Sequence, residues 1–320
     1  MLGRSSSFET GRFAPSTTGR AHPGTLLAAL LCWLDARANS ARVVLRLEDL
    51  DLERTKPGYV DGMVRDLEWL GLEWDSLSLQ SENRGRYEAV LEGLVAEGRV
   101  YACECSRAEI REASHRAPDG SYRYPGTCRS KSVSREAWRS VEGALRLRLD
   151  SRHQTLRDES GLDLSGNAAE LFGDPVLRRR DGVYNYHFAS VLDDSEAGVD
   201  RVVRGRDLAP STILQVALQH ELGLATPSYR HHCLFLERAG DKLSKLHGAV
   251  DIEALRRKYD APELCGQLAS LVGLVPPGTV CRPLDLVADF DWNRVRREDV
   301  ELEWSVDGGL RAGPGGRAGG

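Results

Sequence analysis

Residues 12–31 read RFAPSTTGRAHPGTLLAALL. The turn formers of PSTTG end an extended run, and leucines at helical spacing from Leu26 onward predict a helix that starts near Pro23. The first N–H groups of a helix lack partners and carry the positive end of its dipole, so this loop is suited to hold a phosphate group. His22, directly before the helix, can donate a hydrogen bond to that phosphate. The stretch is also typical of an ordinary turn between a strand and a helix.

The composition is that of a soluble globular protein. The 320 residues are 41% hydrophobic and 28% charged, with a formal net charge of −5, and this length allows a large core and two domains. A negative total charge does not indicate nucleic-acid binding, so any RNA contact must use a local basic surface. We expect no membrane association and no secretion signal, because no apolar run is long enough for either. Seven cysteines, an odd number, argue against a disulfide framework and favour a cytoplasmic protein.

Three charged side chains are expected at the carboxyl ends of parallel strands. Arg12 lies near the end of a strand expected over residues 7–14. Glu48 follows a strand expected over residues 41–47, and Arg204 follows two valines farther along the chain. Ligands of open α/β sheets bind at this edge, where a guanidinium can grip a carboxylate and a carboxylate can accept an ammonium group. Without further context, a solvated arginine and a solvated acidic loop are the more ordinary interpretations.

Three cysteines are spaced for metal binding. Cys103 and Cys105 form a CxC pair, and Cys128 follows 23 residues after the pair. Structural zinc sites have four protein ligands, mostly Cys and His, and leave no position for a water molecule. His115 is the conventional chemical choice for the fourth ligand. Unrelated buried thiols are the alternative interpretation of the same pattern.

Two segments far apart in the sequence resemble signatures of a known family. Residues 22–25 (HPGT) and 242–245 (KLSK) resemble the HIGH and KMSKS signatures of class I aminoacyl-tRNA synthetases. RFAPS before the first segment and RLEDLDLERT after it resemble the glutamyl members of that class. The pattern of a CxC pair followed by a Tyr four residues before the last Cys resembles that of the glutamyl-queuosine tRNA(Asp) synthetases. The resemblance to this family covers roughly residues 8–300. The chain after Lys245 is too short for the anticodon-binding region of glutamyl-tRNA synthetases.

The resemblance implies an α/β fold: a Rossmann-like class I synthetase catalytic domain with an inserted zinc-binding subdomain and a short helical C-terminal part. The expected domains are the first half of the nucleotide-binding fold over residues 7–100, the inserted subdomain over 101–174, the second half over 175–245, the helical part over 246–305 and a disordered tail over 306–320. Within them, helices are expected over 57–70, 87–97, 211–222, 252–259 and 263–273, an antiparallel strand over 144–149, a buried strand over 232–236 and an apolar core segment over 182–192.

The resemblance also implies an activity: activation of glutamate by ATP without tRNA, then transfer to the queuosine base at the wobble position of tRNA(Asp). Glutamate has two carboxylates and one ammonium group, and the sequence does not distinguish which arginine takes which carboxylate. The residues assigned to glutamate are Arg12, Ser16, Glu48, Tyr186 and Arg204; those assigned to ATP are His22, Gly24, Thr25 and Lys245; and His22, Lys242 and Lys245 are assigned to catalysis.

The implied cofactors are one structural Zn²⁺ per chain and Mg²⁺ with ATP. By resemblance, Tyr124 is the fourth zinc ligand beside Cys103, Cys105 and Cys128, with Tyr122 and His115 as alternatives. The implied partners are ATP, glutamate and tRNA(Asp), and we expect a monomer. Two other functions fit the same motifs: a discriminating glutamyl-tRNA synthetase that charges a tRNA 3′ end, and a non-catalytic, synthetase-like RNA-binding protein.

Overall fold

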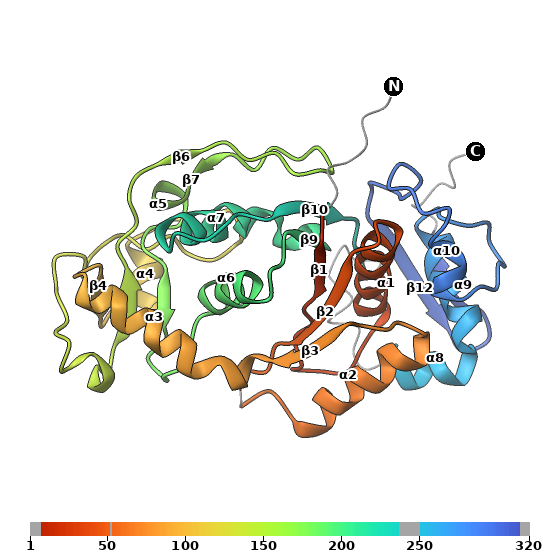
Figure 1. Ribbon diagram of the computed structural model, residues 1–320, viewed down its shortest axis with the longest axis horizontal. Helices are drawn as coiled ribbons and strands as arrows, with labels where there is room; N and C mark the ends of the chain where they lie inside the picture. Colours follow the sequence, from red (N-terminus) through yellow and green to blue (C-terminus); the bar gives the residue numbers. More distant parts are fainter. Residues whose placement is uncertain (1–7, 52, 237–249, 314–320) are drawn as a thin grey trace. The chain divides into compact units, whose positions relative to one another are not determined.

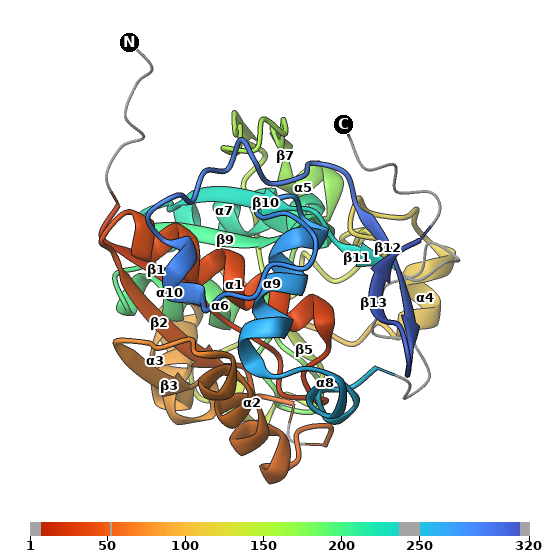
Figure 2. The same ribbon diagram turned by 90° about the vertical axis from the view of Figure 1, so that its right-hand side faces the viewer.

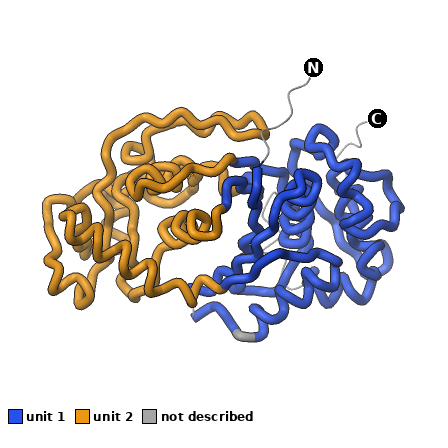
Figure 3. Tube along the Cα trace, viewed as in Figure 1, with its two compact units in different colours: residues 1–78, 199–206, 229–320 blue, residues 79–198, 207–228 orange. Residues whose placement is uncertain are grey.

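The computed structural model describes residues 8–51, 53–236 and 250–313 (Figure 1). The chain divides into two compact units (Figure 3). Unit 1 consists of residues 1–78, 199–206 and 229–320, and unit 2 of residues 79–198 and 207–228. The domain boundaries expected from the sequence stay predictions, because compactness divides the chain at other positions. No helix in the described part of the chain is both long and apolar enough to cross a membrane.

A five-stranded sheet forms the centre of unit 1. Its strand order is β10-β9-β1-β2-β3, and the strands are β1 (Thr10–Phe13), β2 (Arg42–Leu47), β3 (Ser76–Leu79), β9 (Arg201–Gly205) and β10 (Ser228–His232). β1 pairs in parallel with both β2 and β9, which confirms the predicted parallel α/β sheet. β1 is a short strand without clear alternation because it is central and buried on both faces.

Helix α1 (Pro23–Ala38) packs against β1 and β9. It begins at Pro23, as the sequence predicted, and His22 is its N-cap. Its leucines at positions 26, 27, 30, 31 and 34 are at most 1% exposed, so the apolar stripe forms the core. A buried bidentate ion pair joins α1 to β9: Asp35 accepts hydrogen bonds from Arg201 Nε at 2.9 Å and Nη2 at 3.2 Å. Both strand and helix therefore hold fixed positions near the sheet edge.

Three further helices of unit 1 match the predicted segments within a few residues: α2 (Pro57–Leu70), α8 (Ile252–Lys258) and α9 (Ala261–Leu271). The short helix α10 (Pro283–Leu286) was not predicted. Helix α2 has the predicted bounds because Pro57 starts it and Gly71, in the left-handed conformation at φ 85°, ends it.

A three-stranded sheet of order β11-β12-β13 completes unit 1. Its strands are β11 (Phe235–Leu236), β12 (Val300–Ser305) and β13 (Gly309–Ala312), and Figure 2 shows β12 and β13 as neighbours. Three predictions are corrected here. The buried strand over 232–236 is two strands, β10 and β11; the part over 246–305 is not wholly helical, because it contains β12; and the disordered tail over 306–320 is wrong for residues 309–312.

The glycine-rich composition misled the prediction for β13. The strand is held by its antiparallel ladder with β12 and by one apolar side chain, Leu310, which is 1% exposed. The backbone N–H of Leu310 also donates to the Tyr259 hydroxyl at 2.7 Å, and Gln267 Nε2 donates to its carbonyl at 2.8 Å. Backbone pairing therefore orders a segment whose composition alone is typical of disorder.

Unit 2 is built around an antiparallel sheet of order β4-β5-β8. Its strands are β4 (Val100–Cys103), β5 (Ala144–Leu147) and β8 (Val176–Arg178), so the antiparallel strand predicted over 144–149 is confirmed. The other elements are η1 (Gln80–Asn83), α3 (Arg84–Ala96), α4 (Arg107–Glu112), η2 (Trp138–Ser140), β6 (His153–Gln154), β7 (Gly166–Asn167), α5 (Ala168–Leu171), α6 (Tyr186–Glu196) and α7 (Thr212–Glu221), with η3 (Arg206–Ser211) leading into α7. Residues 186–192 of the predicted apolar core segment over 182–192 form the start of α6, and residues 182–185 precede the helix.

Candidate active site and metal centre

The loop after β1 lies along the end of β2 and brings Ser16 beside Glu48. The two residues form an isolated parallel bridge. Glu48 N–H donates to the carbonyl of Pro15 at 3.0 Å, and Thr17 donates to the Glu48 carbonyl through its N–H at 3.2 Å and its hydroxyl at 3.1 Å. The strand ladder therefore continues into the PSTTG loop. This pairing joins two of the residues that the sequence assigned to glutamate.

The Glu48 carboxylate is held by a neighbour that sequence analysis missed. Arg46 Nη2 lies 3.4 Å from Glu48 Oε1, and the Arg46 side chain is 2% exposed. Residues two apart on a strand point to the same side, so the sequence RLE at residues 46–48 could have predicted that Arg46 lies beside Glu48. Arg46 orients the carboxylate at the strand end.

Two buried arginines lie on the neighbouring strands β1 and β9. Arg12 is 4% exposed, and its Nη1 donates to the carbonyl of Val203 at 3.3 Å. Arg204 is 6% exposed, and its Nε donates to His231 Nε2 at 3.1 Å. Its guanidinium carbon also lies 5.2 Å from the centre of the Tyr229 ring. Two buried guanidinium groups on adjacent strands form a donor set that suits a dicarboxylate.

His22 caps the helix whose N-terminus was predicted to bind phosphate. Its Nδ1 accepts a hydrogen bond from the Thr25 N–H at 3.4 Å, so the proton of the neutral ring lies on Nε2. Gly24 leaves room for this ring: a Cβ at Gly24 would lie 3.1 Å from His22 Cε1 and 3.2 Å from Nδ1. The glycine of the HPGT motif therefore fits the imidazole orientation.

The structure does not bring every predicted residue into this group. Arg12, Ser16, His22, Gly24, Thr25, Glu48 and Arg204 all belong to unit 1. Tyr186, the first residue of α6, belongs to unit 2, with its ring centre 5.0 Å from that of His187. Lys242 and Lys245 lie outside the described residues.

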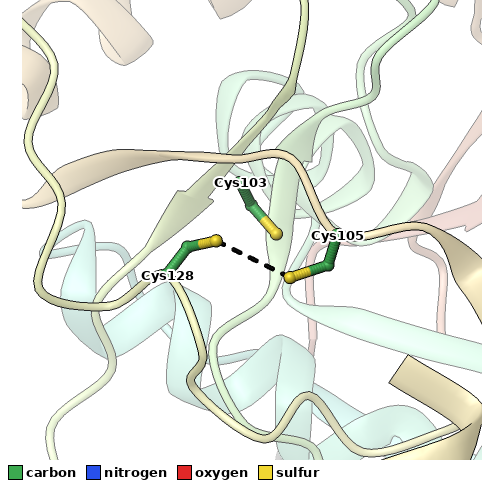
Figure 4. Close-up of side chains that lie close together, drawn as sticks. All are labelled: Cys103, Cys105 and Cys128. Atoms are coloured by element: carbon green, nitrogen blue, oxygen red, sulfur yellow. Dashed lines mark hydrogen bonds between the residues drawn. The ribbon is translucent and has the colours of Figure 1, made fainter. Parts of the chain in front are cut away.

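The predicted cysteines form a cluster in unit 2 (Figure 4). The Sγ atoms of Cys103, Cys105 and Cys128 all lie within 4.8 Å of one another, with Cys105 and Cys128 at 3.6 Å. A tetrahedral zinc ion with Zn–S bonds of about 2.3 Å separates two sulfurs by about 3.8 Å. The observed spacing therefore fits a zinc ion.

Tyr124 is the fourth side chain at this cluster. Its hydroxyl oxygen lies 3.4 Å from Cys103 Sγ and 4.0 Å from Cys105 Sγ. The same oxygen accepts a hydrogen bond from the Cys128 N–H at 2.8 Å, a contact that would also stabilise a phenolate. Burial, followed by the hydrogen bond between the phenol and the Cys103 sulfur, raises the pKa of Tyr124 in the absence of metal. A bound metal would have to overcome that effect.

The two alternative fourth ligands, His115 and Tyr122, have different neighbours from Tyr124. His115 is exposed and is not part of the cluster of His, Cys, Asp and Glu side chains found among the described residues. The Tyr122 ring is covered by the guanidinium of Arg116 at 4.4 Å.

Burial raises the pKa of Cys105 to about 11, and the neighbouring Cys128 thiol adds to the rise. The metal-free Cys105 is therefore a protonated thiol at neutral pH.

Comparison with known proteins defines the class first. Residues 10–298 match the family model of class I tRNA synthetases (E and Q), catalytic domain. A glutamate tRNA ligase from Elizabethkingia meningosepticum, solved in complex with its amino acid, superposes with a TM-score of 0.73 and 25% identity. The match covers 92% of this chain and 66% of that one. The molecule thus has the α/β catalytic fold of a class I tRNA synthetase.

More similar relatives narrow this class. The glutamyl-Q tRNA(Asp) synthetase of Nocardia farcinica is 43% identical over 306 residues, which cover 94% of each chain. That of Symbiobacterium thermophilum is 38% identical and covers 95% of this chain and 98% of its own. That of Chromobacterium violaceum is 40% identical over 94% of this chain and all of its own. The chain therefore belongs to the family of glutamyl-Q tRNA(Asp) synthetases, which confirms the resemblance seen in the sequence.

Proposed function

We propose that the protein activates glutamate with ATP and transfers it to the queuosine base of tRNA(Asp). The observation that carries this proposal is identity of 38–43% over nearly the whole length of relatives named for that activity. The sheet edge of unit 1 supports it, because Ser16 and Glu48 meet there and two buried arginines lie on the strands beside them.

Glutamate recognition follows from charge. Arg12 and Arg204 bind the two carboxylates, and Glu48 binds the ammonium group while Arg46 keeps its carboxylate in place. Glutamine offers a neutral amide where glutamate offers a carboxylate, so it would lose one charge-assisted contact with a guanidinium, and the pocket should discriminate against glutamine. Tyr186 is proposed as a further contact of the same substrate.

Activation is an in-line displacement at phosphorus. A carboxylate oxygen of glutamate attacks the α-phosphorus of ATP, and the bond from that phosphorus to the bridging oxygen of pyrophosphate breaks. His22 Nε2–H and the N-terminus of α1, with Gly24 and Thr25, bind phosphate oxygens. Lys245 neutralises charge on the α-phosphate, and Lys242 assists it. When bound with ATP, Mg²⁺ would supply positive charge that screens the pyrophosphate as it leaves.

Transfer then moves the glutamyl group from AMP to RNA. A hydroxyl of the cyclopentene diol of queuosine attacks the acyl carbon of the adenylate, loses its proton, and AMP leaves. Binding both reactants in this orientation removes much of the entropic barrier of a bimolecular step.

We also infer that Cys103, Cys105, Tyr124 and Cys128 hold one structural zinc ion. The spacing of the sulfurs and the position of the Tyr124 oxygen support this set. Four protein ligands leave no coordination site for a substrate, so the ion would stabilise the loop between β4 and β5 and take no part in the reaction.

One comparison tests the activity. Purified protein is incubated with ATP, labelled glutamate and tRNA(Asp) that either contains or lacks queuosine. Labelling of the queuosine-containing RNA alone supports the proposal. Equal labelling of both RNAs at the 3′ end would show a glutamyl-tRNA synthetase instead. Absence of glutamate-dependent ATP–pyrophosphate exchange would show a non-catalytic protein.

A further inference from the structure

A cavity of about 780 Å³ lies within unit 2, beside Cys103 and Cys105. Its volume is that of a small-molecule site and is far larger than a zinc ion needs. None of the residues assigned above to glutamate or ATP lines it. The walls combine apolar and aromatic side chains with charged groups, so the balance of charge determines which ligand the cavity can bind.

Four arginines and three aspartates line the cavity, and all three carboxylates are used inside the protein. Asp174 accepts hydrogen bonds from the Tyr101 hydroxyl at 2.7 Å and the Leu149 N–H at 2.9 Å. Asp119 accepts from the Ser121 N–H at 2.9 Å. Asp181 accepts from the Val183 N–H at 3.1 Å and is ion-paired with Arg179. Asp119 and Asp181 therefore cap local turns, and Asp174 is ion-paired with Arg129, which does not line the cavity. Of the four cavity arginines, only Arg179 is paired with one of these carboxylates.

The other three arginines form no ion pair within the described part of the chain. Arg107, at the start of α4, is exposed. Arg180 is exposed and donates to the carbonyl of Glu104 at 2.7 Å, with Glu104 and Glu109 attracting it at longer range. Arg146 is 8% exposed. These three side chains make the cavity a site for an anion.

Arg146 gives the most specific signal. Its guanidinium carbon lies 3.7 Å from the centre of the Tyr124 ring, and its Nη1 donates to the Asp174 carbonyl at 2.6 Å. Its Nε is covered by protein, so this atom does not face the cavity. The Arg146 side chain nevertheless lines the cavity wall and carries a buried positive charge, which favours an anion bound there.

An aromatic ring lies beside these cations. The Tyr122 ring is half-buried in the cavity wall and carries Arg116 on one side at 4.4 Å. Single-stranded RNA is bound by this combination, because its unstacked bases stack on aromatic rings and its phosphates bind arginines. A base inside a duplex cannot enter such a cavity.

We propose that this cavity binds one unstacked loop nucleotide of the RNA substrate, with Tyr122 against the base and Arg107, Arg146 and Arg180 around the phosphate. The proposal rests on the proposed function, since it concerns the RNA that accepts glutamate. The nucleotide in this cavity would hold the RNA in place and would not itself react.

The test measures binding of a labelled anticodon stem-loop RNA of tRNA(Asp) by fluorescence anisotropy. The variants Arg107→Glu and Arg180→Glu reverse exposed charges, and a Glu in the first turn of α4 is favourable for the helix. The variant Ser121→Trp fills the cavity mouth without changing charge, since Ser121 is exposed and lines the cavity. The matched control is Arg111→Glu, an exposed position of the same helix that does not line the cavity.

Both cavity charge reversals should raise the Kd for the stem-loop by about tenfold or more at low salt, and each should reduce the salt slope by about 0.7 for the lost phosphate contact. Ser121→Trp should weaken stem-loop binding by a similar factor, whereas Arg111→Glu should change the Kd less than about twofold. A blunt duplex with the sequence of the stem should bind all variants alike. Equal zinc content and melting temperature show that each variant is folded.

Two results would overturn the proposal. One is an Arg111→Glu effect as large as that of Arg180→Glu, which would mean general attraction between RNA and a basic surface. The other is wild-type affinity of Ser121→Trp, which would mean that no nucleotide enters. The proposed function is tested separately by ATP–pyrophosphate exchange and queuosine-dependent labelling with the wild-type protein, so either hypothesis can fail alone.

Discussion

At the scale of single residues, the buried contact between Arg204 and His231 fixes a protonation state. Arg204 Nε–H can only donate, so the His231 Nε2 that faces it at 3.1 Å must be an acceptor. The histidine ring is therefore neutral and carries its proton on Nδ1. With Arg204 6% and His231 3% exposed, this contact fixes how the proposed carboxylate-binding group is presented.

Replacing His231 should weaken glutamate binding. In His231→Leu the buried Arg204 donor loses its acceptor, which costs about 1–3 kcal/mol and should raise KM for glutamate by roughly tenfold with a smaller change in kcat. His231→Gln supplies an amide oxygen and should recover part of the loss. The measurement is ATP–pyrophosphate exchange as a function of glutamate concentration. A Leu variant with wild-type KM would show that His231 does not position Arg204.

Gly24 and His22 give a second residue-scale prediction. In Gly24→Ala the new methyl group approaches the His22 ring to within 3.1–3.2 Å and displaces it, so KM for ATP should rise several-fold in the exchange assay. Ala is a better helix former than Gly, which offsets weakening of the His22 cap on the Thr25 N–H, so the free energy of unfolding should change little. The control is Gly62→Ala in α2, where a Cβ would meet no atom within 4 Å. Loss of exchange in both variants would refute the steric explanation.

At the scale of elements, the sequence predicts what local rules determine. Helix α2 was predicted with its observed bounds because Pro57 and Gly71 mark its ends. The start of α1 was predicted from its leucines and Pro23. β13 was missed because its order comes from pairing with β12 and from the burial of Leu310, neither of which is local. Arg46 and His231 were missed for the same reason: their importance depends on which side chain the fold places beside them.

The segment that leads into β3 depends on one carboxylate, and this predicts a pH effect. Asp75 accepts hydrogen bonds from the Val43 N–H of β2 at 2.7 Å and from Arg37 Nη1 of α1 at 2.8 Å. The Val43 N–H, followed by Arg37, lowers the pKa of Asp75 below its ordinary value of 3.8. A lowered native pKa stabilises the fold above the unfolded value, and that contribution is lost as the pH falls through the native pKa.

Urea unfolding between pH 6 and pH 3 measures this contribution. From about pH 4 downward, the free energy of unfolding should fall less steeply in Asp75→Asn than in the wild type, because the amide does not titrate. At pH 6 the variant should be the less stable of the two, since the ion pair with Arg37 is gone. Identical pH profiles would contradict the assigned role of Asp75. The control Asp119→Asn, at an exposed turn of unit 2, should leave the profile nearly unchanged.

At the scale of the whole molecule, the assigned residues divide between the two units. The residues assigned to the carboxylates and to ATP lie in unit 1, except Lys242 and Lys245, which lie outside the described residues, while the cysteine cluster and the arginine-lined cavity lie in unit 2. Sequence motifs identified the cysteine cluster and the phosphate-binding start of α1, because CxC and HPGT are contiguous patterns. The cavity was not predictable, since Arg107, Arg146 and Arg180 come from separate elements and meet only in the fold.

This division predicts how zinc removal acts. Elemental analysis should find about one zinc per chain, and a strong chelator should lower the melting temperature, because a structural metal contributes its binding free energy to folding. Transfer of glutamate to RNA should fall further than ATP–pyrophosphate exchange, since the cavity shares Cys103, Cys105 and Tyr124 with the metal site.

Tyr124→Phe removes only the phenol oxygen and should weaken zinc binding while the packing of the ring remains.

The matched control for the metal prediction is Cys281→Ser, which removes a half-buried thiol of unit 1 and should keep its zinc. Cys128→Ser should lose it. Tyr124→Phe with wild-type zinc affinity would exclude the phenol as a ligand and leave His115 and Tyr122 as the alternatives, which His115→Ala and Tyr122→Phe then separate. Chelation that leaves both the melting temperature and RNA transfer unchanged would refute a structural metal altogether, because four ligands within one cluster cannot lose their ion without releasing the loop that carries them.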